Sequence, residues 1–247
     1  MLISGKKYAL DCIWNCCPRY NVTFNSDKAS EADTVFVNLD YINIFISEAT
    51  KTSKKFIVLC HNSDKEFNNY WFNILDPYTN HIYSINSIIE NNKVTTIPLG
   101  FVDWKLDFIS NIDRTEVERT IEINASFTLT TNSRIRQPCK DALIKDSRVS
   151  FITTQPLDYY NSLLKSKYII CPEGEGHDTH RLYESIYCGA VPILLKTSCL
   201  KHMYKNYPIK WVDSWDNLDL DWSKDKQMVD DWILQNPDWY STSFHKL

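Results

Sequence analysis

The chain contains 247 residues, of which 43% are hydrophobic, and it carries eight Trp and fourteen Tyr. This length and aromatic content are typical of a globular protein that buries a sizeable core in one large domain or two small ones, and they exclude a disordered chain. The net charge of −4 offers no electrostatic attraction to nucleic acid, so we expect no nucleic-acid partner.

The first half of the chain contains short runs rich in β-branched or aromatic residues, which predict strands separated by helical stretches. The expected strands are Tyr8–Trp14, Thr34–Leu39, Phe56–Cys60 and Val94–Ile97, and the expected helices are Tyr41–Glu48, Asp64–Asn73 and Ser87–Glu90. Residues 105–120 are charged and lack a strand pattern, so we place the crossover to the second half there.

The second half alternates strands and helices more regularly, which predicts a parallel sheet covered by helices. The expected strands are Phe127–Thr130, Val149–Thr153, Tyr168–Cys171, Val191–Leu195 and Ile209–Val212, and the expected helices are Pro138–Lys145, Asp158–Lys165, 180–188, Cys199–Tyr204 and Lys224–Gln235. We therefore expect an α/β chain with one lobe at 1–110, a second at 121–223, and a C-terminal helix within 224–247 that covers the first lobe or its own sheet.

The placement of the cysteines and the lack of long apolar runs predict the cellular compartment of the protein. The eight cysteines include no Cys-x-x-Cys pair, and several lie in apolar runs, where a reduced thiol behaves as a small hydrophobe. Residues 1–7 lack the apolar core of a signal peptide, and no apolar run reaches the roughly eighteen residues of a transmembrane helix. The sequence therefore predicts a cytoplasmic protein without a transmembrane segment.

The stretch 168–184 carries the strongest functional signal. Tyr168–Cys171 is a short apolar run that predicts a strand buried on both faces. In the loop Gly174-Glu175-Gly176 the two glycines allow a turn and a close approach to a ligand, and Thr179 or Asp178 is placed to cap the helix that follows. The amides and the positive dipole end of that helix favour an anion such as a diphosphate.

Three polar side chains project near the first turn of this helix. His180 and Arg181 lie four and three residues before Glu184, which places all three on neighbouring positions of the helix surface. Arg181 would neutralise phosphate oxygens, and Glu184 would accept hydrogen bonds from a ribose diol. The structural alternative is an ordinary ion pair on a solvated helix face.

These residues belong to a pattern that resembles the exostosin family of GT-B glycosyltransferases, in which Ser-Pro-Arg-x-x-Glu precedes Gly-Cys-Val-Pro. The segment Thr179–Pro192 matches this spacing at Arg181, Glu184, Gly189, Val191 and Pro192. It departs from the pattern at Thr179-His180 and at Ala190. The resemblance implies a GT-B-like α/β fold, with two Rossmann-like lobes of parallel sheet, a cleft between them, and a nucleotide sugar bound by the C-terminal lobe.

Other segments carry weaker resemblances. The α1,3-fucosyltransferases have a similarly spaced Thr-Glu-Lys-Leu motif, but His180 replaces the Glu and Arg181 replaces the Lys, so this resemblance ranks second. Residues 124–136 are similar to the strand and loop that open the C-terminal half of GT-B proteins, which implies that Arg136 meets the diphosphate. Residues 60–64 and 94–101 are similar to first-half segments of the same proteins.

Sugar transfer also needs a base for the acceptor hydroxyl, expected on a strand-end loop of the first lobe. His61 and Asp64 follow an apolar run and are our catalytic candidates, with Asp40 and Asp11 as alternatives. The run Asn62-Ser63-Asp64 is also an ordinary helix N-cap sequence, which is the structural alternative.

Two short patterns resemble metal sites. His177-x-x-His180, near Cys171 and Glu184, offers zinc-type donors but matches no usual zinc spacing. Asp219-Leu220-Asp221 resembles the Asp-x-Asp of GT-A enzymes but follows no buried strand, and a solvated turn or a helix cap explains it better. We therefore expect no metal site, and no cofactor apart from the donor substrate.

With the resemblance, the sequence implies a metal-independent, inverting glycosyltransferase. It would move a sugar from a nucleotide sugar to a hydroxyl of a glycan or similar acceptor, and by analogy with the exostosins the donor would be a UDP-sugar. Arg136, residues 174–176 and the helix that begins near His180 would stabilise the departing diphosphate. Two alternatives stay open: a fucosyltransferase-like enzyme that uses GDP-fucose, and a nucleotide- or sugar-binding module without turnover.

Overall fold

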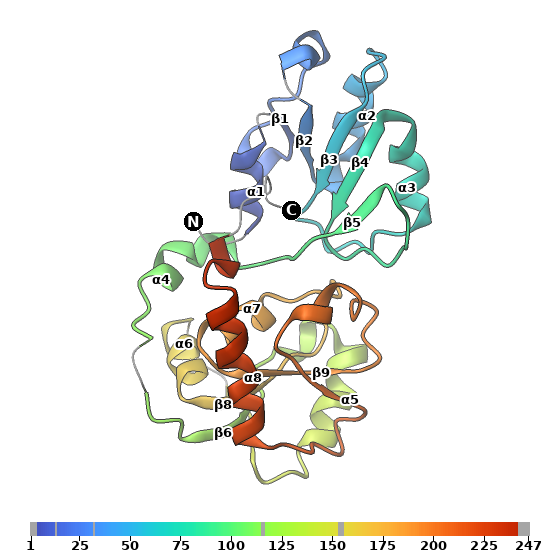
Figure 1. Ribbon diagram of the computed structural model, residues 1–247. Coiled ribbons are helices and arrows are strands. Elements are labelled where there is room, and N and C mark those ends of the chain that lie inside the picture. The colour runs from blue at the N-terminus through green and yellow to red at the C-terminus, as the bar shows by residue number, and fades with distance from the viewer. Residues whose placement is uncertain (1–3, 13, 32, 115–116, 153–155, 242–247) are drawn as a thin grey trace. The chain divides into compact units, whose positions relative to one another are not determined.

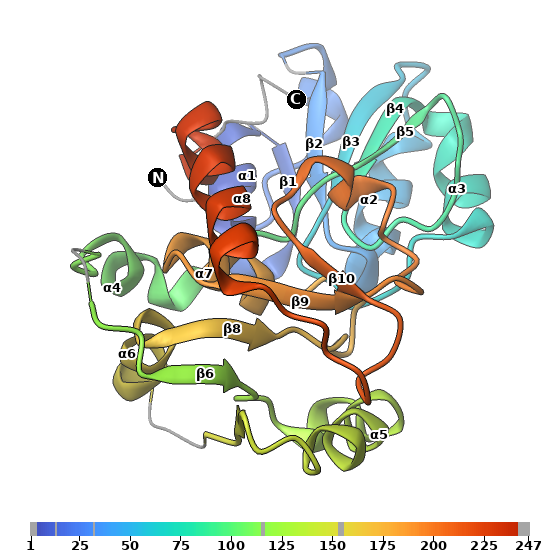
Figure 2. The same cartoon turned by 60° about the horizontal axis from the view of Figure 1, so that its bottom comes forward.

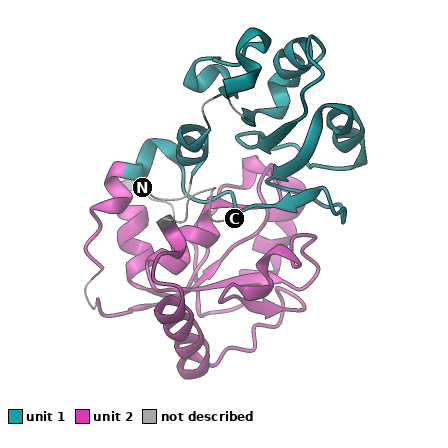
Figure 3. Cartoon of the chain, turned by 45° about the horizontal axis from the view of Figure 1, so that its top comes forward, with its two compact units in different colours: residues 1–106, 241–247 teal, residues 107–240 magenta. Residues whose placement is uncertain are grey.

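A computed structural model describes residues 4–12, 14–31, 33–114, 117–152 and 156–241 of the chain. The structure is α/β, and all pairings between its strands are parallel (Figure 1, Figure 2). The chain divides into two compact units (Figure 3). Unit 1 comprises residues 1–106 with 241–247, and unit 2 comprises residues 107–240.

Unit 1 contains one five-stranded sheet in the order β1-β2-β3-β4-β5. Its strands are β1 (Trp14–Cys16), β2 (Thr34–Val37), β3 (Phe56–Cys60), β4 (Thr79–Ser84) and β5 (Val94–Thr96), and its helices are α1 (Gly5–Asp11), α2 (Ile42–Ala49) and α3 (Asn69–Leu75). Because consecutive strands are neighbours and parallel crossovers are almost always right-handed, the connecting helices α2 and α3 belong to the same face of the sheet.

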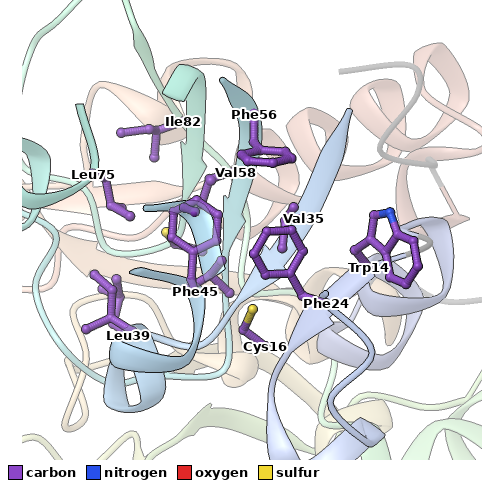
Figure 4. Close-up of a cluster of buried hydrophobic side chains, with 14 of the residues drawn as sticks. Trp14, Cys16, Phe24, Val35, Leu39, Phe45, Phe56, Val58, Leu75 and Ile82 are labelled. Atoms are coloured by element: carbon purple, nitrogen blue, oxygen red, sulfur yellow. The ribbon is translucent and has the colours of Figure 1, made fainter. Parts of the chain in front are cut away.

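Alternating side chains of β2 and β3 fill two hydrophobic clusters, one on each face of this sheet. Val35 and Val58 belong to the larger cluster, where Phe45 of α2 packs against Phe24 and Phe56 (Figure 4). The intervening residues of the two strands belong to a second cluster with α1 residues, which contains Tyr8, Phe36 and Leu59. Burial on both faces explains why these strands read as continuous apolar runs.

Unit 2 contains a second five-stranded sheet in the order β7-β6-β8-β9-β10. Its strands are β6 (Ile121–Asn124), β7 (Val149–Ser150), β8 (Ser166–Ile170), β9 (Val191–Leu195) and β10 (Lys210–Val212), and its helices are α5 (Ser133–Leu143), α6 (Pro156–Leu164), α7 (His180–Tyr187) and α8 (Trp222–Gln235), with α4 (Leu106–Ser110) at the boundary. The strand order reverses between β6 and β8. In doubly wound sheets the crevice outside the carboxyl ends of two such strands is the usual ligand site.

The last helix, α8, packs on the sheet of its own unit, the second of the two placements expected from sequence. Val229 is fully buried in the core that contains Tyr168 and Val191, and Trp222 and Met228 pack against the same core. Within the described part of the chain, no helix combines the length and apolar character that a bilayer crossing requires.

Several predicted elements coincide with the structure and others are wrong. The strands Phe56–Cys60 and Val191–Leu195 are confirmed residue for residue. The expected strand Tyr8–Trp14 is instead mostly α1, which Ser4 caps by accepting a hydrogen bond from the amide of Lys7. The expected strand Phe127–Thr130 is a loop with a short 3₁₀ turn, and β6 lies upstream of it.

Helix boundaries account for most of the remaining differences. Pro138 was expected to start a helix but lies inside α5, which begins at Ser133. Helix α3 begins at Asn69 with Asn68 as its cap, so the N-cap interpretation of residues 62–64 is wrong. The expected helix Ser87–Glu90 is an isolated β-bridge at Ser87 followed by irregular chain. The expected helix Cys199–Tyr204 is a turn followed by a short 3₁₀ segment, and β4 was not predicted. Thr153, the expected end of a strand, lies outside the described residues.

Candidate functional site

The loops that follow β6 and β8 are joined at the point where the strand order of unit 2 reverses. Asn132 donates a hydrogen bond from Nδ2 to the carbonyl oxygen of Gly174 at 2.6 Å, and its Oδ1 accepts one from the amide of Ile135 at 3.3 Å. One side chain therefore caps α5 and holds the glycine loop, a link that the sequence analysis missed.

Arg136 holds the same two loops from inside the protein. Its side chain is 6% exposed, and it donates from Nε to the carbonyl of Glu173 at 2.9 Å and from Nη1 to that of Thr128 at 2.8 Å. A methyl group added at Gly174 would lie 3.2 Å from Nη2, so this glycine permits the close approach of the guanidinium. Burial, and then the charge of Arg181, lowers the pKa of Arg136 to about 10, which leaves it charged at neutral pH.

Arg181, in the first turn of α7, is the second guanidinium at this edge. It donates from Nη2 to the carbonyl oxygen of Ser126 in the loop after β6, and its guanidinium carbon lies 5.7 Å from the ring centroid of Tyr159. Its Nε is buried and has no hydrogen-bond acceptor. Two cations near each other, one with an unmet buried donor, make this edge of the sheet suited to an anion.

Hydrogen bonds to Asp178 hold the chain just before α7, but the N-cap side chain does not accept a hydrogen bond from the first turn of the helix. Thr179 has the extended backbone of an N-cap residue and makes no side-chain capping bond. Asp178 is 3% exposed and accepts hydrogen bonds from the hydroxyls of Tyr183, at 2.6 Å, and Tyr204. His180 is the first, half-buried residue of the helix. The helix dipole at this position also favours an anion.

Glu184 lies inside the protein next to α6. Its carboxylate is 4% exposed and accepts hydrogen bonds from the hydroxyls of Tyr159 at 2.8 Å and Tyr160 at 2.5 Å. Burial, and then the charge of Glu184, raises the pKa of both tyrosines above the usual range. The solvated ion pair considered as the alternative is therefore wrong. A carboxylate has about four lone-pair sites, so a ribose contact stays a prediction.

Gly189 belongs to the sequence pattern for a structural reason. Its φ of 69° is in the left-handed region, its amide donates to the carbonyl of Ile186, and the amide of Ala190 donates to that of Ser185, both at 2.9 Å. This is the Schellman arrangement that ends α7 and turns the chain into β9.

The two catalytic candidates of unit 1 follow β3 but have different surroundings. His61 is 1% exposed, and its ring centroid lies 5.1 Å from that of Tyr8 and 6.3 Å from that of Phe36. Asp64 is exposed. The catalytic role of either residue stays a prediction, and exposure favours Asp64.

The other carboxylates of unit 1 that were considered as bases have basic partners. Asp40 pairs with Lys65 at 3.0 Å, and Asp11 pairs with Lys7 at 2.7 Å. Neither carboxylate is therefore an isolated base in this structure.

A hydrogen-bonded chain near His61 was not anticipated. Asn62 has a φ of 59° and donates from Nδ2 to the Tyr20 hydroxyl at 2.5 Å, and that hydroxyl donates to Asp103. The amide of Lys6 also donates to Asp103, at 2.8 Å. Four segments of unit 1 meet here, so no local pattern in the sequence could have indicated the arrangement.

The potential metal ligands are grouped differently from either sequence pattern. Nδ1 of His177 lies 3.0 Å from Oε2 of Glu173, and Cys199 offers a sulfur donor to the same group. Cys171 is instead buried, which raises its pKa to about 12. Asp221 is the N-cap of α8 and accepts from the amide of Lys224 at 3.2 Å, as the helix-cap interpretation predicted.

A separate cavity of about 910 Å³ lies at the opposite, amino edge of the same sheet. Its lining includes Lys167, Gly189 and Lys226. Lys167 pairs with Glu122, at 2.6 Å, and Lys226 pairs with Asp230. Two arginines, Arg114 and Arg119, also line this cavity. Because parallel sheets bind ligands at their carboxyl edge, we assign the anion site to the β6 and β8 loops.

Comparison with known proteins adds no family assignment. No protein-family model matches the chain, and no curated protein matches it significantly. The functional proposal below therefore depends on the fold and on the geometry of these loops.

Proposed function

We propose that the chain is a GT-B-type glycosyltransferase that binds the diphosphate of a nucleotide sugar at the carboxyl edge of β6 and β8 in unit 2. Two Rossmann-like sheets of five parallel strands support this proposal. The observation that carries it is the buried Nε of Arg181, which has no acceptor. An unsatisfied buried donor costs about 1–3 kcal/mol, and an anionic oxygen that displaces the atoms covering Nε would recover that energy.

Each residue at this edge has a separate part in the proposed site. Arg136 positions the glycine loop, because two of its donors already hold loop carbonyls. Arg181 and the amino end of α7 would stabilise the negative charge that develops on the departing diphosphate. Glu184, held in place by two tyrosine hydroxyls, would accept hydrogen bonds from the ribose.

The proposed transfer inverts the anomeric carbon. The acceptor oxygen attacks that carbon, the bond to the diphosphate oxygen breaks, and the diphosphate leaves with the electron pair. The proton of the acceptor hydroxyl passes to a base, for which Asp64 is the first candidate and His61 the second. A site with two guanidiniums and a helix amino end supplies the charge that other transferases take from a metal ion.

Binding and turnover of nucleotides by the full chain test the proposal. Calorimetric titration with UDP and GDP, followed by hydrolysis assays with a panel of nucleotide sugars, should show UDP binding and donor hydrolysis that Arg181→Ala reduces. Arg134→Ala is the matched control, because Arg134 is an exposed arginine two residues before Arg136 on α5.

The possible outcomes separate the competing functions. Preference for GDP would support the fucosyltransferase-like alternative. Nucleotide binding without any turnover would indicate a binding module. Failure to bind either nucleotide would overturn the proposed site.

The state of the cysteines supports a reducing, cytoplasmic setting for this enzyme. All eight cysteines are free, and seven of them are buried. Buried thiols fill the core as small hydrophobes and form no disulfide in this structure. Cytoplasmic location is therefore part of the proposal.

A further inference from the structure

Three side chains of different chemistry meet beside the glycine loop. Glu173 and His177 contact each other at 3.0 Å, and the ligand atoms of these two residues and of Cys199 all lie within 4.8 Å of one another. Glu173 and His177 are half-buried and Cys199 is exposed. A carboxylate oxygen, an imidazole nitrogen and a thiol sulfur are thus presented to one point at the protein surface.

Cys199 differs from every other cysteine of the chain. The other seven are buried, and it lies exposed in the turn after β9. Because this sulfur is exposed, a metal ion in solution can reach it directly. Cys171, which the sequence places near His177, is instead buried in the core.

We propose that Glu173, His177 and Cys199 bind a divalent metal ion of the zinc type. Sulfur and imidazole ligands select such an ion, whereas Mg²⁺ and Ca²⁺ prefer sites made of oxygen atoms alone. Zinc bonds of roughly 2.0–2.3 Å place tetrahedral ligand atoms roughly 3–4 Å apart. The pair formed by Glu173 and His177 already has this separation, and the sulfur of the exposed Cys199 lies within 4.8 Å of both ligand atoms, so a change in its side chain would bring it into the same range.

The location of the three ligands means that a bound ion would stabilise the conformation of the glycine loop. Glu173 and His177 directly flank the loop 174–176, and Cys199 belongs to the turn after the neighbouring strand β9. A bound ion would fasten both ends of the glycine loop and tie it to that turn. Three protein ligands leave a fourth position for water or for an oxygen of another ligand. This site does not depend on the proposed transferase activity.

Cobalt titration of the reduced, chelator-treated full chain tests the site directly. We expect one Co²⁺ per chain, a thiolate-to-cobalt charge-transfer band in the near ultraviolet, and displacement by Zn²⁺ but not by excess Mg²⁺. Cys199→Ser should abolish the band. His177→Ala and Glu173→Gln should each lower Zn²⁺ affinity by about tenfold or more, because removing a ligand costs at least as much as removing its support.

His202→Ala is the matched control for these variants. His202 is an exposed histidine three residues after Cys199, and it contacts the Cys199 carbonyl oxygen at 3.1 Å. We expect this variant to keep wild-type Zn²⁺ affinity. The proposal is overturned if Cys199→Ser binds Co²⁺ with the wild-type spectrum, or if His202→Ala loses as much affinity as His177→Ala. Neither readout involves nucleotide binding, so failure of the transferase proposal would leave this result interpretable.

Discussion

Replacing Arg181 with alanine should separate ligand binding from protein stability. In the folded chain its guanidinium donates a charged hydrogen bond to Ser126, worth about 1.5–3 kcal/mol, and contacts the Tyr159 ring, worth about 0.5–1 kcal/mol. Its unsatisfied Nε costs about 1–3 kcal/mol, and its charge repels Arg136. These contributions nearly cancel, so we expect the free energy of unfolding to change by no more than about 2 kcal/mol.

Nucleotide affinity should respond much more strongly to the same substitution. Loss of a charge-assisted contact to a phosphate oxygen costs about 1–3 kcal/mol, which corresponds to roughly a 5–150-fold increase in Kd. Calorimetric titration with UDP measures this change, and urea unfolding followed by tryptophan fluorescence measures stability. Arg134→Ala should alter neither quantity, because Arg134 is exposed on α5.

A large loss of stability without any loss of UDP affinity would show that the buried Nε of Arg181 is not evidence of a ligand site. Suppose that Arg181→Ala lowers the free energy of unfolding by more than about 3 kcal/mol, beyond the usual range for one substitution, and leaves the Kd of UDP unchanged. Arg181 would then support the loop after β6 and bind no ligand. Arg181→Lys serves as a second measurement. It keeps the charge but loses the planar fork of donors, so we expect it to recover only part of the affinity.

The other predictions concern stability. Arg136→Ala removes two hydrogen bonds from a buried charge to different loops, so it should lower the free energy of unfolding by about 3 kcal/mol or more in urea, whereas Arg134→Ala should stay within about 0.5 kcal/mol of wild type. Gly189→Ala forces a side chain into the left-handed region and against a guanidinium, so calorimetry should show a loss of about 1–2 kcal/mol. Burial acts to raise the pKa of Asp103, but hydrogen bonds from the Tyr20 hydroxyl and a backbone amide lower it below the ordinary value of 3.8. The ionised carboxylate therefore stabilises the fold above pH 3.8, and this stabilisation is lost as the pH falls through the pKa that Asp103 has in the folded protein. Asp103→Asn should therefore flatten the decline in stability below pH 3.8, measured by urea unfolding at several pH values, and an unchanged acid slope would contradict this role.

The sequence specified best those strands that are buried on both faces. The runs Phe56–Cys60 and Val191–Leu195 are continuously apolar and short, which leaves a core strand as the only compatible element. Strand β6, Ile-Glu-Ile-Asn, and the wrongly expected strand Phe127–Thr130 both alternate apolar and polar residues over four positions, so periodicity could not choose between them. The apolar run after Tyr8 fits a strand or a helix equally well, and the cap at Ser4 decides for the helix.

Apart from Arg136, which the family resemblance supplied, site residues were predictable only where they share one local segment. Arg181, Glu184 and the loop 174–176 lie within a single strand, loop and helix unit, so spacing alone placed them at one edge. The contacts of Asn132 with Gly174 and of Cys199 with the group around His177 cross between separate loops. Such pairs depend on the strand order of unit 2, which periodicity and spacing do not determine.

The five positions that match the exostosin-like pattern have unequal value as evidence of function. The left-handed backbone at the end of α7 requires Gly189, and Val191 and Pro192 are buried in β9. Any chain with the same helix and strand geometry would favour similar residues at these three positions. Glu184 already accepts two tyrosine hydroxyls, which a purely structural role also explains. Only Arg181 has a buried donor that the fold leaves unsatisfied. The case for a bound diphosphate therefore depends on that one side chain, and its substitution is more decisive than further similarity at the other four positions.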